Sequence, residues 1–451
     1  MKGLVPVVVK ENAQKTVRMI VQKTVQVTVP KVVLQDVLPA ALKRVGVIAL
    51  AAAQIRVSSD VEILATLVAE IVVRENNNMR QTITFIVTQD CQLRCKYCYL
   101  VGKNRQEEMS EETALQVVDY VLQHPTDFNT DEEIVFDFIG GEPLLRIELI
   151  EAVCAYITKR IGEENAPWQG KYSFRITTNG ILYGSSEVQQ FISTYHDKLY
   201  VTISLDGTED KHDASRVYPN GKGSYNDIIK NVPLWLQQFP ETSTKVIVSS
   251  ENVSYVKESI IHLCDLGIKY IDVNPVLEAG WKEGDDTIFE QQLIALADYI
   301  IEHNLTEDHH IGCFNIQIGE KLSLEEESKW CDLSNTLCVD ANGFFYPCIR
   351  FAKYSLRNKQ PWPVGSLEHG IDKNKMRPFL FLDRITQSPQ KCLDCEVASG
   401  CGWCPAENYD SANTHTLYQR STAICKMHKA RVRAKNYYWN KLAYKYNHRN
   451  D

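Results

Sequence analysis

The sequence lacks the features that would direct the protein to a membrane or to nucleic acid. Its 451 residues contain no run of roughly 18 or more apolar residues, so no membrane-spanning helix is predicted. The formal net charge is −8, which gives no general attraction to nucleic acid or anionic lipid. Residues 1–30 lack the apolar segment and small-residue cleavage site of a signal peptide. We therefore expect a cytoplasmic protein with no membrane and no nucleic-acid partner.

Aromatic residues and cysteine are missing from the first part of the chain. Residues 1–78 contain no Cys, Phe, Tyr or Trp, but they contain nineteen valines. A segment this short builds an independent core poorly without an aromatic ring. We therefore treat residues 1–78 separately within a chain whose 451 residues suit two or three domains.

Cysteine is absent before residue 91, yet the chain contains fourteen in all, and nine of these lie between Cys313 and Cys425. The cytoplasm keeps thiols reduced, so this number indicates metal or redox chemistry and not disulfides. The histidines are not spaced in the sequence as metal-binding histidines usually are. The cysteines thus form two groups, one in each half of the chain beyond residue 80.

Strand-like and helix-like stretches alternate from residue 80 onward. Helical stretches such as 111–123 and 148–161 separate β-rich apolar runs. This alternation predicts an α/β fold, a partial (β/α)6 TIM-like barrel, because right-handed crossovers place each helix outside a parallel sheet. Chemistry in such barrels gathers at the carboxyl ends of the strands. The six runs are "TITFIVT", "EEIVFDFI", "YSFRITT", "LYVTISL", "TKVIVSS" and "KYIDVNPV".

Three cysteines follow the first of these strands. The stretch "TQDCQLRCKYCYL" places Cys91, Cys95 and Cys98 within eight positions. Three thiolates from one loop can hold three irons of a cubane cluster and leave the fourth iron without a protein ligand. Tetrahedral zinc would require a fourth N or S ligand, which this loop lacks. The loop therefore predicts an iron–sulfur cluster with one open iron.

This triad, with Tyr97 just before its last cysteine, resembles the signature of the radical SAM enzymes. The resemblance implies that S-adenosylmethionine (SAM) binds the open iron of a [4Fe-4S] cluster through its amino and carboxylate groups. One electron then cleaves SAM into methionine and a 5′-deoxyadenosyl radical, which abstracts a hydrogen atom from the substrate. It also implies a reductant such as flavodoxin or ferredoxin. The cofactors supply the chemistry, and the protein orients them and excludes water.

The turn "FIGGEPLL" after the second strand resembles the Gly-Gly-Glu-Pro turn of the same family. Gly140 and Gly141 permit close backbone approach, and the resemblance implies that Glu142 accepts hydrogen bonds from the methionine ammonium of SAM. Without the cysteine triad, the same residues would read as an ordinary turn before a helix.

Further polar residues follow the third and fourth strands. "TTNG" contains Asn179, and "SLDG" contains Ser204 and Asp206; these are either SAM contacts or simple turn formers. "HDASR" resembles a His-Asp-x-x-Arg segment of the peptide-modifying branch, in which Arg216 would pair with the SAM carboxylate. A surface ion pair is the alternative for Arg216.

The second cysteine group resembles the SPASM extension of this family, which carries two auxiliary [4Fe-4S] clusters. The match includes Gly343, which four residues separate from Cys348, but the central run ends in Cys-x2-Cys where the family has Cys-x3-Cys. When the ligand positions of the SPASM pattern are carried over to this sequence, the resemblance implies one distal and one proximal set of ligands. The distal set is Cys392, Cys395, Cys401 and Cys425; the proximal set is Cys331, Cys348 and Cys404.

The fourth ligand of the proximal cluster is open in the sequence, with Cys338 favoured over Cys313. Cys154 and Cys264 lie on apolar helix faces and are predicted to be core thiols. Zinc is the alternative metal for the second group. Its five-residue spacer is short for a zinc ribbon, however, and the thiols outnumber the ligands of one zinc site.

The segments "GCGWCPAENY" and "ICKMHKA" look most like maturases of small Cys-rich peptides. The resemblance implies hydrogen abstraction from a Cys-rich precursor peptide followed by a thioether crosslink. One alternative is an anaerobic sulfatase-maturing, formylglycine-forming enzyme. Another is a non-catalytic iron–sulfur electron carrier or peptide-binding scaffold. The sequence does not rank the candidate bases Asp206, Asp272 and Glu278.

The predicted organisation has a radical SAM core over residues 79–305 and a SPASM domain over residues 306–451. Residues 1–78 have two interpretations, a small peptide-recognition domain of the winged-helix kind, or an appended or spuriously translated segment before a start at Met79. Deleting residues 1–78 and assaying the remainder distinguishes them.

Overall fold

The computed structural model describes residues 81–103, 107–163, 166–278, 280–323, 331, 333, 335–410 and 412–447. Both interpretations of residues 1–78 therefore concern residues outside this part of the chain. Within it, no helix has the length and apolar character needed to cross a membrane.

All six predicted strands are present and are parallel to their neighbours, which confirms the partial barrel. They divide between two sheets: β1 to β4 pair in chain order, and β5 pairs with β6. The strands are β1 (Thr82–Thr88), β2 (Ile134–Gly140), β3 (Tyr172–Thr178), β4 (Leu199–Ile203), β5 (Ser243–Val248) and β6 (Tyr270–Pro275).

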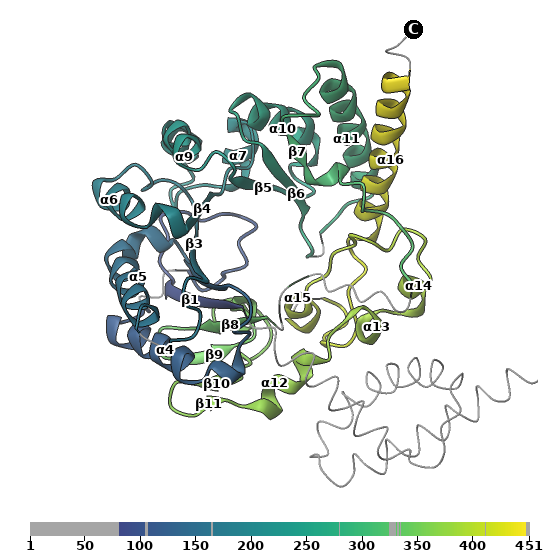
Figure 1. Cartoon of the computed structure of the whole chain (residues 1–451). Helices are drawn as coiled ribbons and strands as arrows, with labels where there is room; N and C mark the ends of the chain where they lie inside the picture. Colours follow the sequence, from purple (N-terminus) through teal and green to yellow (C-terminus); the bar gives the residue numbers. More distant parts are fainter. Residues whose placement is uncertain are drawn as a thin grey trace, which may run out of the picture.

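The helices between these strands cover the outside of the barrel, as Figure 1 shows. Alternate strand residues such as Phe85, Phe138 and Phe174 are fully buried in the shared core. Ser110 caps the first of these helices by accepting a hydrogen bond from the Thr113 backbone N–H. The helices are α4 (Glu111–Gln123), α5 (Ile147–Ile161), α6 (Ser186–Tyr195), α7 (Glu209–Ser215), α8 (Tyr225–Ile228), α9 (Val232–Gln238), α10 (Val256–Asp265) and α11 (Asp285–Glu302).

Side chains connect the two sheets where β4 meets β5. The Thr244 hydroxyl donates to the Ile203 carbonyl at 2.9 Å and accepts from the Leu205 N–H at 3.2 Å. The Lys211 ammonium donates to the Ile247 carbonyl at 2.8 Å. The barrel is therefore continuous in space, although the backbone ladder is interrupted at this point.

The Cys-rich segment adds strands to both sheets. β7 (His310–Ile311) pairs with β6, and β8 (Thr336–Val339) pairs in parallel with β1 on the side opposite β2. The larger sheet then continues through β9 (Phe344–Tyr346), β10 (Gly365–Ser366) and β11 (Gly370–Ile371).

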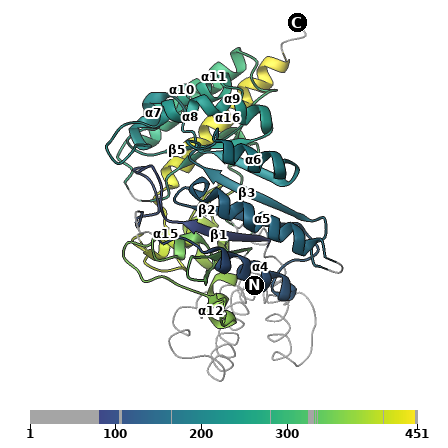
Figure 2. The same cartoon turned by 90° about the vertical axis from the view of Figure 1, so that its left-hand side faces the viewer.

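The remaining helices follow in the C-terminal part of the chain. Figures 1 and 2 place the long α16 (Cys425–Asn447) against α11. The shorter ones are α12 (Lys373–Leu380), α13 (Arg384–Gln387), α14 (Gln390–Leu393) and α15 (Pro405–Asp410). The cysteines predicted to lie in the core, Cys154 and Cys264, are buried on α5 and α10.

Candidate active site

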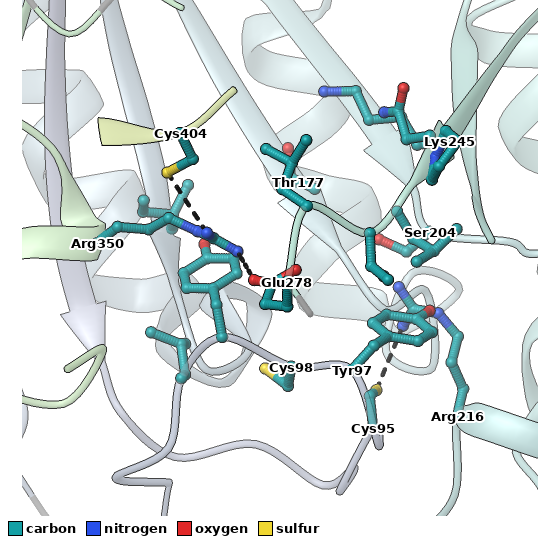
Figure 3. A pocket seen from close by; sticks show the side chains of 18 of the residues that line it. Cys95, Tyr97, Cys98, Thr177, Ser204, Arg216, Lys245, Glu278, Arg350 and Cys404 are labelled. Carbon is teal, nitrogen blue, oxygen red and sulfur yellow. Dashed lines mark hydrogen bonds and ion pairs between the residues drawn. The ribbon is translucent and has the colours of Figure 1, made fainter. Parts of the chain in front are cut away.

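A cavity of about 510 Å³ lies between the carboxyl ends of the strands and the Cys-rich segment. Both cysteine groups contribute to its lining, and Figure 3 shows Cys95 and Cys98 on one side and Cys404 on the other. Most of the predicted SAM contacts also line it: Tyr97, Gly140, Gly141, Glu142, Asn179, Ser204 and Arg216. Residues distant in sequence thus share one compartment.

The loop of the first three cysteines is bound to the segment that ends α7. The Arg94 N–H donates to the Val217 carbonyl at 2.6 Å, and the Lys96 N–H donates to the Ser215 carbonyl at 2.9 Å. The guanidinium of Arg216, the residue between Ser215 and Val217 in the chain, reaches the Cys95 sulfur at 3.7 Å. The "HDASR" segment therefore fixes the position of the cysteine loop.

The Gly-Gly turn holds the other side of the cysteine loop. The Gly141 N–H donates to the Thr88 carbonyl at 2.8 Å. A Cβ on Gly140, whose φ is +148°, would lie 2.1 Å from the Thr88 oxygen, and one on Gly141 would lie 2.0 Å from the Asp90 oxygen. Any side chain here would displace the backbone that leads into Cys91.

Glu142 is a buried carboxylate at the wall of the cavity, with 1% of its surface exposed. It accepts hydrogen bonds from the Leu144 N–H (3.0 Å), the Thr178 hydroxyl (2.6 Å) and the Asn179 N–H (2.7 Å). Burial raises its pKa, and these hydrogen bonds oppose the rise. A carboxylate has about four acceptor positions, so roughly one is left for a cationic donor in the cavity. Glu142 therefore fits the ammonium of SAM.

Asp206 lies behind the cavity wall and does not line it. It is fully buried, accepts a short hydrogen bond from the Tyr97 hydroxyl and forms an ion pair with Arg216 (3.5 Å). Burial by itself raises the pKa of Asp206, but Lys211 and Arg216 lower it more, so the net shift is downward. Asp206 therefore holds Tyr97 and Arg216 in place from beneath and has no direct access to a ligand.

The three loop cysteines also share a cation that the sequence did not indicate. Lys103 lines the cavity, and although burial lowers its pKa, the sulfurs of Cys98, Cys91 and Cys95 raise it more. Three thiolates with a nearby cation, and with no fourth ligand among the described residues, fit a [4Fe-4S] cluster with one iron open to the cavity. No pattern in the sequence singles out this lysine.

The distal cysteines lie near one another, and two of them, Cys392 and Cys401, interact with Arg420. Burial raises the pKa of Cys392, Arg420 lowers it, and Cys425 and Cys395 raise it. The Arg420 guanidinium donates to the Cys401 sulfur at 3.0 Å. The structure thus brings together the four cysteines that sequence position assigned to one cluster.

The proximal cysteines gather around Cys348. Burial raises the pKa of Cys348, and Cys404 and Cys331 raise it further. Cys338, on β8, also interacts electrostatically with Cys348, whereas Cys313 interacts with Arg431 and Asp272. Of the two candidate fourth ligands, the structure places Cys338 beside the proximal set.

No three of the described Cys, His, Asp or Glu side chains converge as ligands of a single metal ion do. The cavity between the two cysteine groups is lined by Cys91, Cys95, Cys98, Cys331 and Cys404, and cysteine thiolates are the ligands of iron–sulfur clusters.

An ion pair lies between the two cysteine groups. Arg350 contacts the Cys404 sulfur at 3.5 Å and Glu278 at 2.7 Å, and its guanidinium lies 5.0 Å from the centre of the Tyr99 ring (Figure 3). Of the three candidate bases, only Glu278 lines the cavity. Asp272 is exposed on β6, and Asp206 is buried as described.

One face of α16 completes the lining, and sequence reasoning missed it. Met427, His428 and Arg431 share one face of α16, and Ile424, which immediately precedes the helix, continues the same i, i+3, i+4, i+7 spacing. The His428 Nε2 lies 2.6 Å from the Val397 carbonyl, and its Nδ1 lies 3.0 Å from the Arg431 guanidinium. The neutral imidazole satisfies both contacts, because Nε2–H donates and Nδ1 accepts.

This arrangement predicts a pH-dependent loss of stability. Burial and the Arg431 charge lower the pKa of His428 to about 4, from an ordinary value of 6.5. The unfolded chain therefore takes up a proton as the pH falls below 6.5, while the folded chain does not. Between pH 7 and pH 5, His428→Gln should lose about 2 kcal/mol less free energy of unfolding than the wild type. Urea titrations at each pH measure this difference, and equal losses in the two proteins would contradict it.

Comparison with known sequences gives a consistent set of relatives. The Radical SAM superfamily profile matches residues 85–263. The chain is 32% identical over 293 residues to an uncharacterized protein, MJ0907, of Methanocaldococcus jannaschii, covering 64% of this chain and 89% of that protein. It is 26% identical over 361 residues to a cysteine-type anaerobic sulfatase-maturating enzyme of Clostridium novyi, covering 74% and 91%.

A further relative is the antilisterial bacteriocin subtilosin biosynthesis protein AlbA of Bacillus subtilis, 26% identical over 348 residues, covering 74% of this chain and 68% of that protein. Among solved structures, anSMEcpe with bound AdoMet has a TM-score of 0.60 at 21% identity and covers 81% of this chain and 99% of that one. SuiB of Streptococcus suis bound to its precursor peptide SuiA has a TM-score of 0.51 at 14% identity, with 82% of each chain covered. Both structures share the fold.

Proposed function

The chain belongs to the radical SAM superfamily, and we propose that it is a cytoplasmic peptide maturase that abstracts a hydrogen atom from a Cys-rich precursor peptide and forms a thioether crosslink. The observation that carries this proposal is the single cavity lined by Cys91, Cys95 and Cys98 together with Cys331 and Cys404. A substrate there can meet SAM and an auxiliary cluster at once. A simple electron carrier would not need the Glu142 and Arg216 positions beside the first cysteine loop.

The residues of the cavity fit distinct roles in this reaction. Cys91, Cys95 and Cys98 would hold the first cluster, while Glu142 and Arg216 would orient the amino and carboxylate groups of SAM. When bound, SAM and its cluster supply the hydrogen-abstracting radical, with electrons from a reductant such as flavodoxin or ferredoxin. The distal and proximal cysteines would hold the auxiliary clusters, and one of these clusters would accept the electron released when the peptide thiolate and the substrate carbon radical form the C–S bond.

Glu278 is the group best placed to accept a proton. It is partly buried, lines the cavity and is oriented by Arg350, which also contacts Cys404. A peptide thiol near Cys404 would therefore meet a carboxylate within the same cavity. Loss of a proton to Glu278 would prepare that thiol for bond formation.

The relatives favour a second candidate, oxidation of a cysteine or serine to formylglycine in a sulfatase, because one of them is a sulfatase-maturating enzyme. The two reactions leave different products. A thioether link makes the peptide lighter by two hydrogen atoms and consumes a cysteine thiol, whereas formylglycine leaves an aldehyde and no crosslink.

The experiment is an anaerobic turnover of the full chain with SAM, dithionite and either a Cys-rich peptide encoded beside its gene or a sulfatase-derived peptide. Formation of 5′-deoxyadenosine with a crosslinked product, identified by mass and by resistance to thiol alkylation, is expected. An aldehyde that reacts with a hydrazine probe would instead establish the second candidate. SAM cleavage with both peptides unchanged would count against both.

A further inference from the structure

Arg420 is a buried cation without a carboxylate partner in the part of the chain that the structure describes. Its residue is 5% exposed, and no ion pair joins it to an Asp or Glu. A guanidinium remains charged at any physiological pH, and burying a charge without compensation costs several kcal/mol. Within the described part of the chain, the compensating negative charge therefore has to come from groups other than Asp and Glu.

Cysteine sulfur is the source that the geometry offers. The Arg420 Nη2 lies 3.0 Å from the Cys401 sulfur, and Arg420 acts electrostatically on both Cys392 and Cys401. Neutral thiols would compensate a guanidinium poorly, whereas thiolates bound to a metal centre carry the required charge. The burial of Arg420 is thus explained if the distal set holds an anionic cluster.

The guanidinium is also held in one orientation. The guanidinium lies 4.1 Å from the centre of the Trp403 ring, in a cation–π contact. The backbone N–H of Arg420 donates to the Gln387 carbonyl at 2.9 Å. The same Nη2 is 3.5 Å from the carbonyls of Cys401 and Gly402. The Arg420 charge and its N–H···S contact are therefore held in a constant position relative to the cluster, whereas the charge of a mobile surface lysine is not.

We propose that Arg420 is a positioning residue that raises the reduction potential of the distal auxiliary cluster. Reduction adds negative charge to the cluster, and a buried cation with a hydrogen bond to a ligand sulfur stabilises the reduced form more than the oxidised form. The inference relies on the proposed function only for the identity of the cluster. It does not require SAM cleavage or any particular substrate.

The test uses the full chain with Cys91, Cys95 and Cys98 changed to alanine, so that only auxiliary clusters contribute to the measurement. Redox titration followed by EPR is compared for this protein and for its Arg420→Gln, Arg420→Lys and Arg433→Gln forms. Arg433 is a matched control, since this arginine on α16 pairs with Glu290 at the surface.

Arg420→Gln should make reduction of one auxiliary cluster at least tenfold less favourable, which corresponds to a fall of about 59 mV for one electron. Arg420→Lys should give a smaller fall, because it keeps the charge but loses the planar fork, and Arg433→Gln should give none. If Arg420→Gln loses iron, full iron in Arg420→Lys with a lowered potential still supports the proposal. An unchanged potential in Arg420→Gln, or loss of the distal iron in both variants, would overturn it. Neither result depends on whether the proposed peptide reaction occurs.

Discussion

Changing Cys91, Cys95 and Cys98 together to alanine should abolish SAM cleavage and leave the auxiliary iron in place. The open iron has no substitute, so the loss should exceed the roughly 100-fold effect of losing a residue that merely supports a metal ligand. Iron content should fall by about a third, because the proposed function assigns three clusters to the chain and this variant loses one. Release of 5′-deoxyadenosine under reducing conditions, with iron and sulfide analysis, measures both effects.

The matched control is Cys154→Ala, which removes a buried thiol from α5. Cys154 does not line the cavity. This variant should keep its iron and its cleavage rate. A triple variant that still cleaves SAM would refute the assignment of the first cluster. A triple variant that loses all its iron would show that the two cysteine groups do not load independently.

Asp206→Asn should produce the largest loss of stability among single substitutions at the site. The fully buried carboxylate compensates the Arg216 guanidinium and acts on the buried Lys211. Breaking a buried ion pair from one side leaves the opposite charge uncompensated, which costs about 3–5 kcal/mol. Urea unfolding of the anaerobic protein measures the change.

Asp298→Asn is a suitable comparison, because Asp298 pairs with Lys441 and both side chains are about a third exposed. This exposed pair should contribute no more than about 1 kcal/mol. Equal losses in the two variants would mean that burial does not amplify the Asp206 interaction. A change in SAM affinity with unchanged stability would instead place Asp206 in contact with the cofactor.

The helices, strands and cysteine motifs that could be predicted are those that depend on residues close together in the sequence. The stretch 111–123 became α4 with the same bounds, because its apolar spacing and the Ser110 cap are encoded within a few residues. All six strand-like runs became strands for the same reason. The cysteine spacings were equally local, so the metal-ligating candidates could be named before any arrangement in space was known.

The positions of residues relative to others far away in the sequence could not be predicted from such local patterns. No property of residues 336–339 alone indicates that they pair with β1, more than 240 positions earlier in the chain. Asp206 follows a strand as Ser204 does, yet one lies beneath the wall of the cavity and the other lines it. Lys103 and the face of α16 that bears His428 were missed because their importance depends on which distant sulfurs and carbonyls lie beside them.

The parallel pairing of β8 with β1 has a consequence for any attempt to dissect the protein. Because β1 carries the first cysteine loop and has a neighbour on each side, cutting the chain before residue 336 would leave its backbone N–H and C=O groups unpaired along one flank. Such a fragment would expose a template for self-association beside the loop of Cys91, Cys95 and Cys98. The two cysteine groups therefore belong to one folding unit. A smaller enzyme cannot be obtained by cutting the chain before residue 336.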